Sequence, residues 1–484
     1  MIKYQKNIVG EYLMNNKLIY GIKDKPQLGK RIVFAFQQLL AIMAATITVP
    51  LLVGNGMSTS AALFGAGVGT LVYQVFTKFR SPVFLGSSFA FIGSMLAAFA
   101  GAMSSVALGY LGLILGAIFG GLVYVILAVI VKFVGVNWIN KLMPAAVIGP
   151  TVALIGLSLS GAAIKDVFTY GPQDGNGAFI MSGSAWVSLV CALVTLFTVV
   201  ICSTYGKKMV KLIPFIIGVL AGYAVALIFT VIGHHYGIDA LKVIDFAPFT
   251  ALASDGVSLK TFVSLPDFTF LTAADGLKDF DLNYLVTIAV AYVPVAFVVF
   301  AEHIADHKNL SSIIGEDLLE NPGLHRTLLG DGIGSVAGAF FGGCPNTTYG
   351  ESVGCVAITR NASVVTITTT AILAILISFV SPFVAFLSSI PKCVMGGVCI
   401  TLYGFIAVSG LKMIKKVDLE DNANLFTVSV ILITGVGGMA LAIGKVTLTT
   451  TACALILGII VNIVLNKFKK AAPAEKEGNT NEKL

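Results

Sequence analysis

Charged side chains are scarce in this chain of 484 residues: only 11% are Asp, Glu, Lys or Arg, whereas 57% are hydrophobic. Soluble domains carry about 25% charged residues, so this composition excludes an ordinary soluble enzyme. Apolar runs of about 20 residues, the length that crosses a bilayer as a helix, recur along most of the chain. We therefore predict an all-α polytopic membrane protein, in which the net charge of +7 reflects topology rather than binding to nucleic acid.

Clustered metal ligands and paired cysteines are also missing. The seven cysteines form no CxxC pair, and the five histidines form no cluster beside them. Because a zinc site needs several converging Cys or His ligands, we expect buried free thiols, no metal and no cofactor. A nucleophile and base pattern of the kind that enzymes use is absent as well, which favours a transporter over a membrane-embedded enzyme.

Basic residues between the apolar runs set the predicted orientation. If residues 1–31 form a cytoplasmic tail, alternate connections carry Lys or Arg and all of them face the cytoplasm, as the positive-inside rule requires. This pattern predicts about fourteen spans in the cytoplasmic membrane and places both termini, including a tail over residues 469–484, in the cytoplasm. The predicted spans cover residues 32–53, 59–77, 83–101, 108–131, 140–160, 183–203, 209–233, 284–306, 327–343, 345–359, 363–389, 392–411, 423–443 and 446–466.

A long polar connection over residues 236–282 divides the spans into two halves, residues 32–235 and 283–468, with about seven spans each. An odd number of spans makes the halves insert with opposite orientation. We therefore predict two inverted repeats, which are typical of transporters with a site near the membrane midplane. The connection itself is predicted to be extracellular, and its sequence fits an ordered flap and a flexible loop equally well.

The third span of each half is interrupted by small and hydroxyl side chains. Residues 84–93 read FLGSSFAFIG, and residues 344–354 read CPNTTYGESVG. Such residues favour extended or turn backbone, so each segment is predicted to be a short strand followed by a half-helix. The start of a half-helix presents unpaired N–H donors and partial positive charge, so the two ends together could form one polar site. The alternative is that Pro and Gly only kink two packed helices.

Glu302, Asp306 and Glu351 lie in apolar surroundings. A charge inside the membrane costs about 2.5–3.5 kcal/mol, so such residues usually face a protein interior or a water-filled path. Glu302 and Asp306 are one helical turn apart on one face, and Glu351 opens the second half-helix, where the helix dipole favours a carboxylate. We expect these acids to bind substrate or carry protons. Asp306 has an alternative role as an ordinary charge at the cytoplasmic end of its helix.

Several short motifs point to a family. They are AEH at 301–303, NPGLHR at 321–326, PNTTYGE at 345–351, AITR at 357–360 and VMGGV at 394–398. Together they resemble bacterial uracil permeases of the nucleobase-ascorbate transporter family, over about residues 35–465. The family signature maps onto Glu351, Ser352, Gly354, Thr359 and Arg360, with Ser352 in place of the usual Asn.

The resemblance implies a core domain, a gate domain and a substrate between them. The core would comprise about residues 32–136 and 283–389, and the gate about residues 137–235 and 390–468. The resemblance also implies a homodimer that forms through the gate domains.

By similarity to the family, uracil would contact both half-helices and the eighth span. The carboxylates of Glu302 and Glu351 would accept hydrogen bonds from the ring N–H groups, which suits a base with two N–H donors and two carbonyl acceptors. The remaining implied contacts are backbone N–H groups at Phe89 and Gly350, and side chains of Ala45 from the first span and Tyr403 from the gate.

Two residues depart from the uracil permease pattern: Asp306 and Gln38 each stand where the family often has His. Glu351 favours uracil, because xanthine and urate carriers of the family typically have Gln there. Our hypothesis is a symporter that imports uracil with protons by alternating access, with proton coupling through Glu302, Asp306 and Glu351. The alternatives are a xanthine, uric acid or other nucleobase symporter and, less favoured, an anion transporter of related architecture, whose substrate Glu351 would repel.

Overall fold

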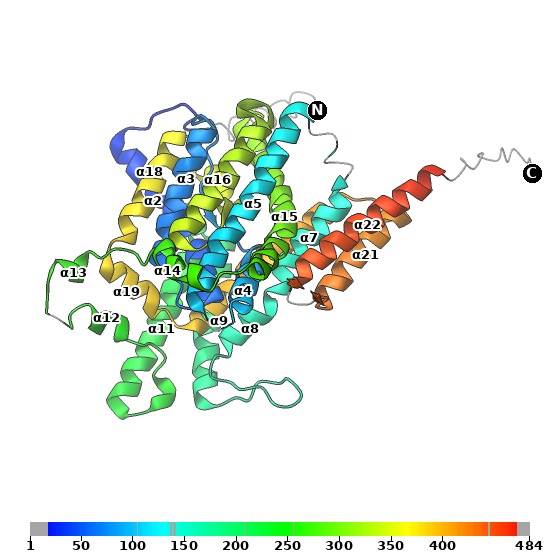
Figure 1. Ribbon diagram of the computed structural model, residues 1–484. Coiled ribbons are helices and arrows are strands. Elements are labelled where there is room, and N and C mark those ends of the chain that lie inside the picture. Colours follow the sequence, from blue (N-terminus) through cyan, green and yellow to red (C-terminus); the bar gives the residue numbers. More distant parts are fainter. Residues whose placement is uncertain are drawn as a thin grey trace, which may run out of the picture.

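A computed structural model describes residues 18–471 except 104, 136–137, 139–141, 208, 255 and 444–445. Most of these residues form helices that stand side by side in one bundle (Figure 1). The predicted C-terminal tail from residue 472 onward and the first part of the predicted N-terminal tail lie outside the described residues, whereas residues 469–471 belong to the last helix.

Long helices make up most of the bundle. Within the described residues, nine helices are long and apolar enough to cross a membrane, and this confirms a polytopic helical membrane protein. The main helices are α2 (Leu28–Val53), α3 (Thr59–Phe76), α5 (Val106–Val134), α7 (Ala145–Ser158), α9 (Gly183–Tyr205), α11 (Pro214–Tyr236), α15 (Leu282–Ile314), α16 (Leu324–Gly342), α18 (Val364–Ser378), α20 (Lys392–Ile414), α21 (Asn422–Val436) and α22 (Thr450–Ala471).

The main helices pack in two groups. In the first group, α2, α3, α5, α15, α16 and α18 make their most extensive contacts with one another, and in the second, α7, α9, α11, α20, α21 and α22 do so. In Figure 1, α2, α3, α5, α16 and α18 stand together, whereas α21 and α22 extend away on the other side of α7. The bundle is therefore two packed units rather than one uniform array.

Glycines let helices approach closely inside each group. A Cβ added to Gly69 of α3 would lie 2.6 Å from the carbonyl oxygen of Gly334 on α16. In the second group, a Cβ on Gly410 of α20 would lie 2.5 Å from the carbonyl oxygen of Gly149 on α7. Small residues at such contacts are the usual way in which membrane helices gain van der Waals packing.

Two short strands pair with each other inside the first group. Strand β1 (Leu85–Ser87) pairs antiparallel with β2 (Asn346–Thr348), and Gly86 faces Thr347 in the register. The half-helices α4 (Ile92–Gly101) and α17 (Gly350–Thr359) follow the strands. The predicted strand and half-helix in each interrupted segment are thus confirmed, and the simple kink is wrong.

Part of the bundle differs from the predicted spans. Helix α21 ends at Val436 and α22 begins at Thr450, because β3 (Leu441–Ile443) and β4 (Val446–Leu448) lie between them and pair antiparallel. Gly438, at a positive φ of 75°, favours the chain's departure from the helix. The prediction that one helical span ends at 443 and the next begins at 446 was therefore wrong, because Leu441–Ile443 and Val446–Leu448 are strands.

Two other regions also contain more helices than predicted. The predicted span 363–389 is divided into α18 and α19 (Ser381–Ser389), with Pro382 in the first turn of α19, where proline is tolerated. Helix α8 (Ser160–Val167) extends the fifth predicted span. The remaining short helices are α10 (Met209–Leu212), α12 (Ala247–Ala251), α13 (Leu259–Phe262), α14 (Thr269–Asp275) and the single turns Asp239–Leu241, Gly276–Lys278 and Leu319–Gly323.

The connection at 236–282 is ordered where the structure describes it. Helix α14 packs against α5, and the backbone N–H of Ser264 donates to the carbonyl of Phe379 at 3.0 Å. Of the two alternatives that the sequence left open, these contacts favour the ordered flap.

Candidate functional site

A cavity of about 370 Å³ lies between the two helix groups. Side chains from α2, α15 and α17 line one wall, and side chains from α7, α9, α11 and α20 line the other. The lining includes Lys211 and Ile358, both of which are exposed, so the cavity reaches the protein surface at that end. A ligand here would contact both groups at once.

The three predicted acids line this cavity together. Glu302 and Asp306 come from α15, and Glu351 comes from the first turn of α17. Each of these side chains keeps part of its surface accessible. Gly350 lines the same cavity, and a Cβ added there would lie 4.0 Å from Oδ1 of Asp306. The start of the half-helix therefore faces the acids of α15, although the roles of these residues stay predictions.

Asp306 is held by a neighbouring strand. Its Oδ2 accepts a hydrogen bond of 2.8 Å from the hydroxyl of Thr348 in β2. Helix α15 continues to Ile314, so Asp306 lies more than two turns before the helix ends. The alternative of an ordinary helix-end charge is therefore wrong, and Asp306 belongs to the cavity wall.

Three other predicted site residues do not line the cavity. Ala45, Phe89 and Tyr403 are buried, and none of them is among its lining residues. Phe89 lies between β1 and α4, and its ring meets the Tyr403 ring of α20 edge to face, with centroids 5.9 Å apart. This contact joins the two helix groups, so the structure brings Phe89 and Tyr403 to each other rather than into the cavity.

The wall formed by the second helix group contains residues that sequence reasoning missed as site residues. Lys211 was interpreted only as a topology marker, yet it lines the cavity with Ser203 of α9 and Ser409 of α20. Phe215 and Phe405 add two aromatic rings, whose centroids lie 6.0 Å apart. The sequence gives little indication that these serines and phenylalanines line a site, because isolated Ser and Phe residues are common in membrane helices.

The two unusual residues Gln38 and Ser352 contact each other. Nε2 of Gln38 in α2 donates to the hydroxyl oxygen of Ser352 in α17 at 2.7 Å. The same oxygen accepts from the backbone N–H of Phe84 at 3.1 Å. Gln38 is buried and does not line the cavity. It therefore holds the first turn of α17 from the side away from the cavity and does not contact a ligand there.

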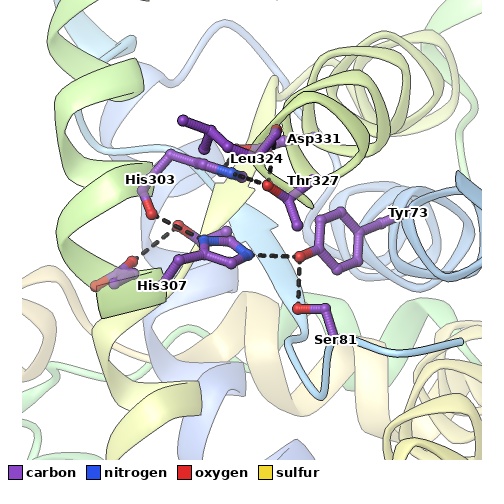
Figure 2. Close-up of polar contacts among 9 residues, drawn as sticks. Tyr73, Ser81, His303, His307, Leu324, Thr327 and Asp331 are labelled. Carbon is purple, nitrogen blue, oxygen red and sulfur yellow. Dashed lines mark hydrogen bonds and ion pairs between the residues drawn. The ribbon is translucent and has the colours of Figure 1, made fainter. Parts of the chain in front are cut away.

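The opposite face of α15 carries two buried histidines (Figure 2). Nδ1 of His303 lies 2.6 Å from Oδ2 of Asp331 in α16. Nε2 of His307 lies 2.8 Å from the hydroxyl of Tyr73 in α3, and that hydroxyl lies 2.7 Å from the hydroxyl of Ser81. These contacts fasten α15 to α16 and α3, which leaves Glu302 and Asp306 pointing to the cavity.

The hydrogen bonds around His303 determine the net charge of its pair with Asp331. The Thr327 hydroxyl donates to the carbonyl of Leu324 at 3.0 Å, so its oxygen is left to accept from Nε2–H of His303 at 2.9 Å. One further proton then lies between Nδ1 and the Asp331 carboxylate. Whichever atom holds that proton, the pair is neutral overall, and this removes most of the cost of its burial.

Asp331 was also missed by the sequence analysis. It lies within the predicted span 327–343, so the rule that flagged the other intramembrane acids applies to it equally. Asp331 lies between Gly330 and Gly332, in a span that the sequence analysis considered only as a helix of the bundle.

Comparisons with known proteins agree closely with one another. A model described as the Permease family matches residues 29–444. Uracil permease of Bacillus caldolyticus is 38% identical over 460 residues, covering 94% of this chain and 97% of the relative. Uracil permease of Bacillus subtilis (strain 168) is 35% identical over 474 residues, covering 97% of this chain and 99% of the relative.

A solved structure has the same fold at low sequence identity. The inward-facing structure of the murine anion transporter Slc26a9 aligns with a TM-score of 0.62 and 12% identity, covering 92% of this chain and 69% of that chain. At this identity the likeness shows the fold alone.

We expect Gln38→Ala and Ser352→Ala to be non-additive, because both remove the same hydrogen bond. Each single variant should lower the free energy of unfolding, and the double variant should cost less than their sum by about 0.5–3 kcal/mol. Denaturant unfolding in detergent measures this coupling. As a control, Gln38→Ala combined with Ser389→Ala, a buried serine near Tyr223 of α11, should be additive. Full additivity of the Gln38 and Ser352 variants would contradict the assigned contact.

We expect Asp331→Asn to be much milder than Asp331→Ala. The Asn amide can donate to Nδ1 of neutral His303, whereas Ala leaves that nitrogen buried without a partner, at a cost of about 1–3 kcal/mol. The midpoint of thermal unfolding in detergent compares the two variants. Glu316→Ala, at an exposed acid beyond α15, should leave the midpoint unchanged. Equal losses for Asn and Ala would show instead that the pair is stable only as an ion pair, with His303 protonated and Asp331 ionised.

Proposed function

We propose, from the premise that this chain belongs to the permease family, that it imports uracil across the cytoplasmic membrane together with protons. Family membership confirms the resemblance seen in the sequence and identifies the chain as a transporter rather than an enzyme. Uracil as the substrate is supported by two uracil permeases that align over nearly the whole chain. The observation that carries the proposal is the cavity lined jointly by Glu302 and Glu351.

The chemistry of this cavity suits uracil. The ring presents two N–H donors, and the carboxylates of Glu302 and Glu351 are acceptors on two different elements. The first N–H groups of α17 have no helical carbonyl to bond, so the amide of Gly350 is available to a ring carbonyl. The backbone N–H of Phe89 would donate to the second ring carbonyl after the substrate has separated the Phe89 and Tyr403 rings. In that position the base would also lie near Ala45 and Tyr403. An unmade hydrogen bond in such a site costs about 1–3 kcal/mol, which provides discrimination among bases.

Other nucleobases and anions fit this cavity less well. Xanthine or uric acid remains the alternative within the family, since both also present N–H and carbonyl groups. Slc26a9 shows that the fold can belong to an anion transporter. Here, however, three acids line one cavity against a single lysine, Lys211, and such a balance repels an anion.

Alternating access follows from the two helix groups. We assign α2–α5 and α15–α18 to a core that carries the acids, and α7–α11 and α20–α22 to a gate. Their separate packing supports movement of one against the other. The cavity reaches the surface near Lys211, at the end that the positive-inside rule places in the cytoplasm. The conformation is therefore inward-facing, and a homodimer through the gate groups would hold the gate still.

Proton coupling is assigned to the acids of the cavity. Three carboxylates within one partly enclosed space repel one another, so the empty carrier is stabilised when a proton is shared among them. Glu302 and Asp306 lie one turn apart, which suits transfer of that proton between them, and Glu351 adds charge from α17. Without this coupling, the carrier would only equilibrate uracil across the membrane.

Competition for uptake tests the substrate. We expect excess uracil to abolish uptake of labelled uracil in proteoliposomes, whereas thymine, xanthine and uric acid at the same concentration compete at least tenfold less well. Stronger competition by xanthine or uric acid would replace uracil with a purine as the substrate.

A pH gradient tests the coupling. An external pH below the internal pH should drive uracil accumulation by the wild type. Glu302→Gln, which cannot exchange a proton, should lose this accumulation. Glu316→Gln, at an exposed acid outside the cavity, is the matched control and should accumulate uracil normally. Gradient-driven accumulation by Glu302→Gln at the wild-type level would remove the proton mechanism.

A further inference from the structure

A second cavity, of about 280 Å³, lies on the outer side of the first helix group, between the end of α5 and the start of α16. Lys132, His325 and Arg326 line it, and none of the described acidic side chains does. Aromatic and aliphatic side chains, including Phe76 and Phe133, form the rest of its wall. This basic cavity shares no lining residue with the cavity of the three acids.

The positive charge of this basic cavity has no acidic partner in the part of the chain that the structure describes. Among the described residues, neither Lys132 nor Arg326 forms an ion pair. His325 and Arg326 also lie in the first turn of α16, where the helix dipole already disfavours cations. The two cations Lys132 and Arg326, together with the start of α16, create a positive potential that an anion from outside can balance.

An apolar stripe leads from the basic cavity along α5. Leu122, Ile126, Val129 and Phe133 are 50%, 57%, 49% and 78% exposed, and their spacing of three or four residues places them on one face of the helix. Val129 and Phe133 line the cavity as well. A molecule that fills the cavity therefore has a continuous apolar surface beside it, about three turns long by the helical rise.

We propose that this basic cavity binds the phosphate of an anionic phospholipid, whose acyl chain lies along the α5 stripe. Basic pockets between membrane helices on the cytoplasmic side are suited to such headgroups, and the positive-inside rule places Lys132 on that side. The lipid bridges α5 and α16, so it braces the group of helices that carries the acids. The inference does not depend on uracil being the substrate.

Native mass spectrometry of the full chain in detergent, titrated with phosphatidylglycerol or phosphatidylcholine, tests the proposal. The wild type should retain phosphatidylglycerol in preference to phosphatidylcholine. The double variant Lys132→Gln/Arg326→Gln should bind phosphatidylglycerol about thirtyfold more weakly, since each basic residue near an anionic headgroup contributes about fivefold. Unchanged binding by this variant would overturn the proposal.

Matched variants and a second anion make the test specific. Lys132→Arg/Arg326→Lys keeps both charges and should keep the lipid, which separates charge from misfolding. Lys412→Gln/Lys415→Gln removes two exposed charges at the end of α20 and should bind like the wild type. An equal loss in this control would show that total charge, not the cavity, holds the lipid. Displacement of the lipid by an equal concentration of inorganic phosphate would assign the cavity to free phosphate and overturn the proposal.

Discussion

The pairing of β1 with β2 is the interaction on which the site depends. Inside a membrane, an unpaired backbone N–H or C=O group costs several kcal/mol, so extended chain is tolerated only when protein surrounds and pairs it. Each strand comes from a different half of the chain and supplies the other's partners. Side chains complete the pairing at the edges, where the Thr70 hydroxyl accepts from Leu85 N–H at 2.9 Å.

This pairing also determines where the half-helices begin. Because β2 is fixed by β1, helix α17 starts directly after it, with Gly350 and Glu351 facing α15. The Thr348 hydroxyl then reaches Asp306, so a strand residue sets the orientation of a cavity acid. Loss of the β1–β2 pairing would therefore change the positions of the cavity acids before it changed the packing of the helices.

The fold was largely predictable where the local sequence dictates the backbone. Apolar runs predicted the positions of most long helices, and clusters of Gly, Ser, Thr and Pro predicted the positions of strands β1 and β2. The strands β3 and β4 were not predicted, because their flanks are as apolar as a membrane helix and hydropathy does not distinguish strand from helix there. The division of α18 from α19 was missed for the same reason, although Pro382 marks the start of α19.

The site was predictable only in part, because its contacts join distant parts of the chain. Glu302, Asp306 and Glu351 stood out as charges in apolar runs, and they share one cavity. Gln38 and Ser352 were each recognised as unusual, yet a single sequence gives no sign that residues 314 positions apart touch. The same holds for His303 and Asp331, whose pairing requires knowledge that α15 and α16 lie side by side.

The two faces of α15 explain how the acids that we propose as proton carriers can lie on a helix packed inside the first helix group. On the buried face, His303 and Asp331 share a proton and together carry no net charge. On the cavity face, Glu302 and Asp306 are accessible to water and ligand. A change of protonation in the cavity therefore leaves the hydrogen bonds to α3 and α16 intact. The hydrogen bonds on the buried face thus hold Glu302 and Asp306 in place whatever their charge. The proposed symport requires this, because proton and substrate are to bind in one fixed geometry.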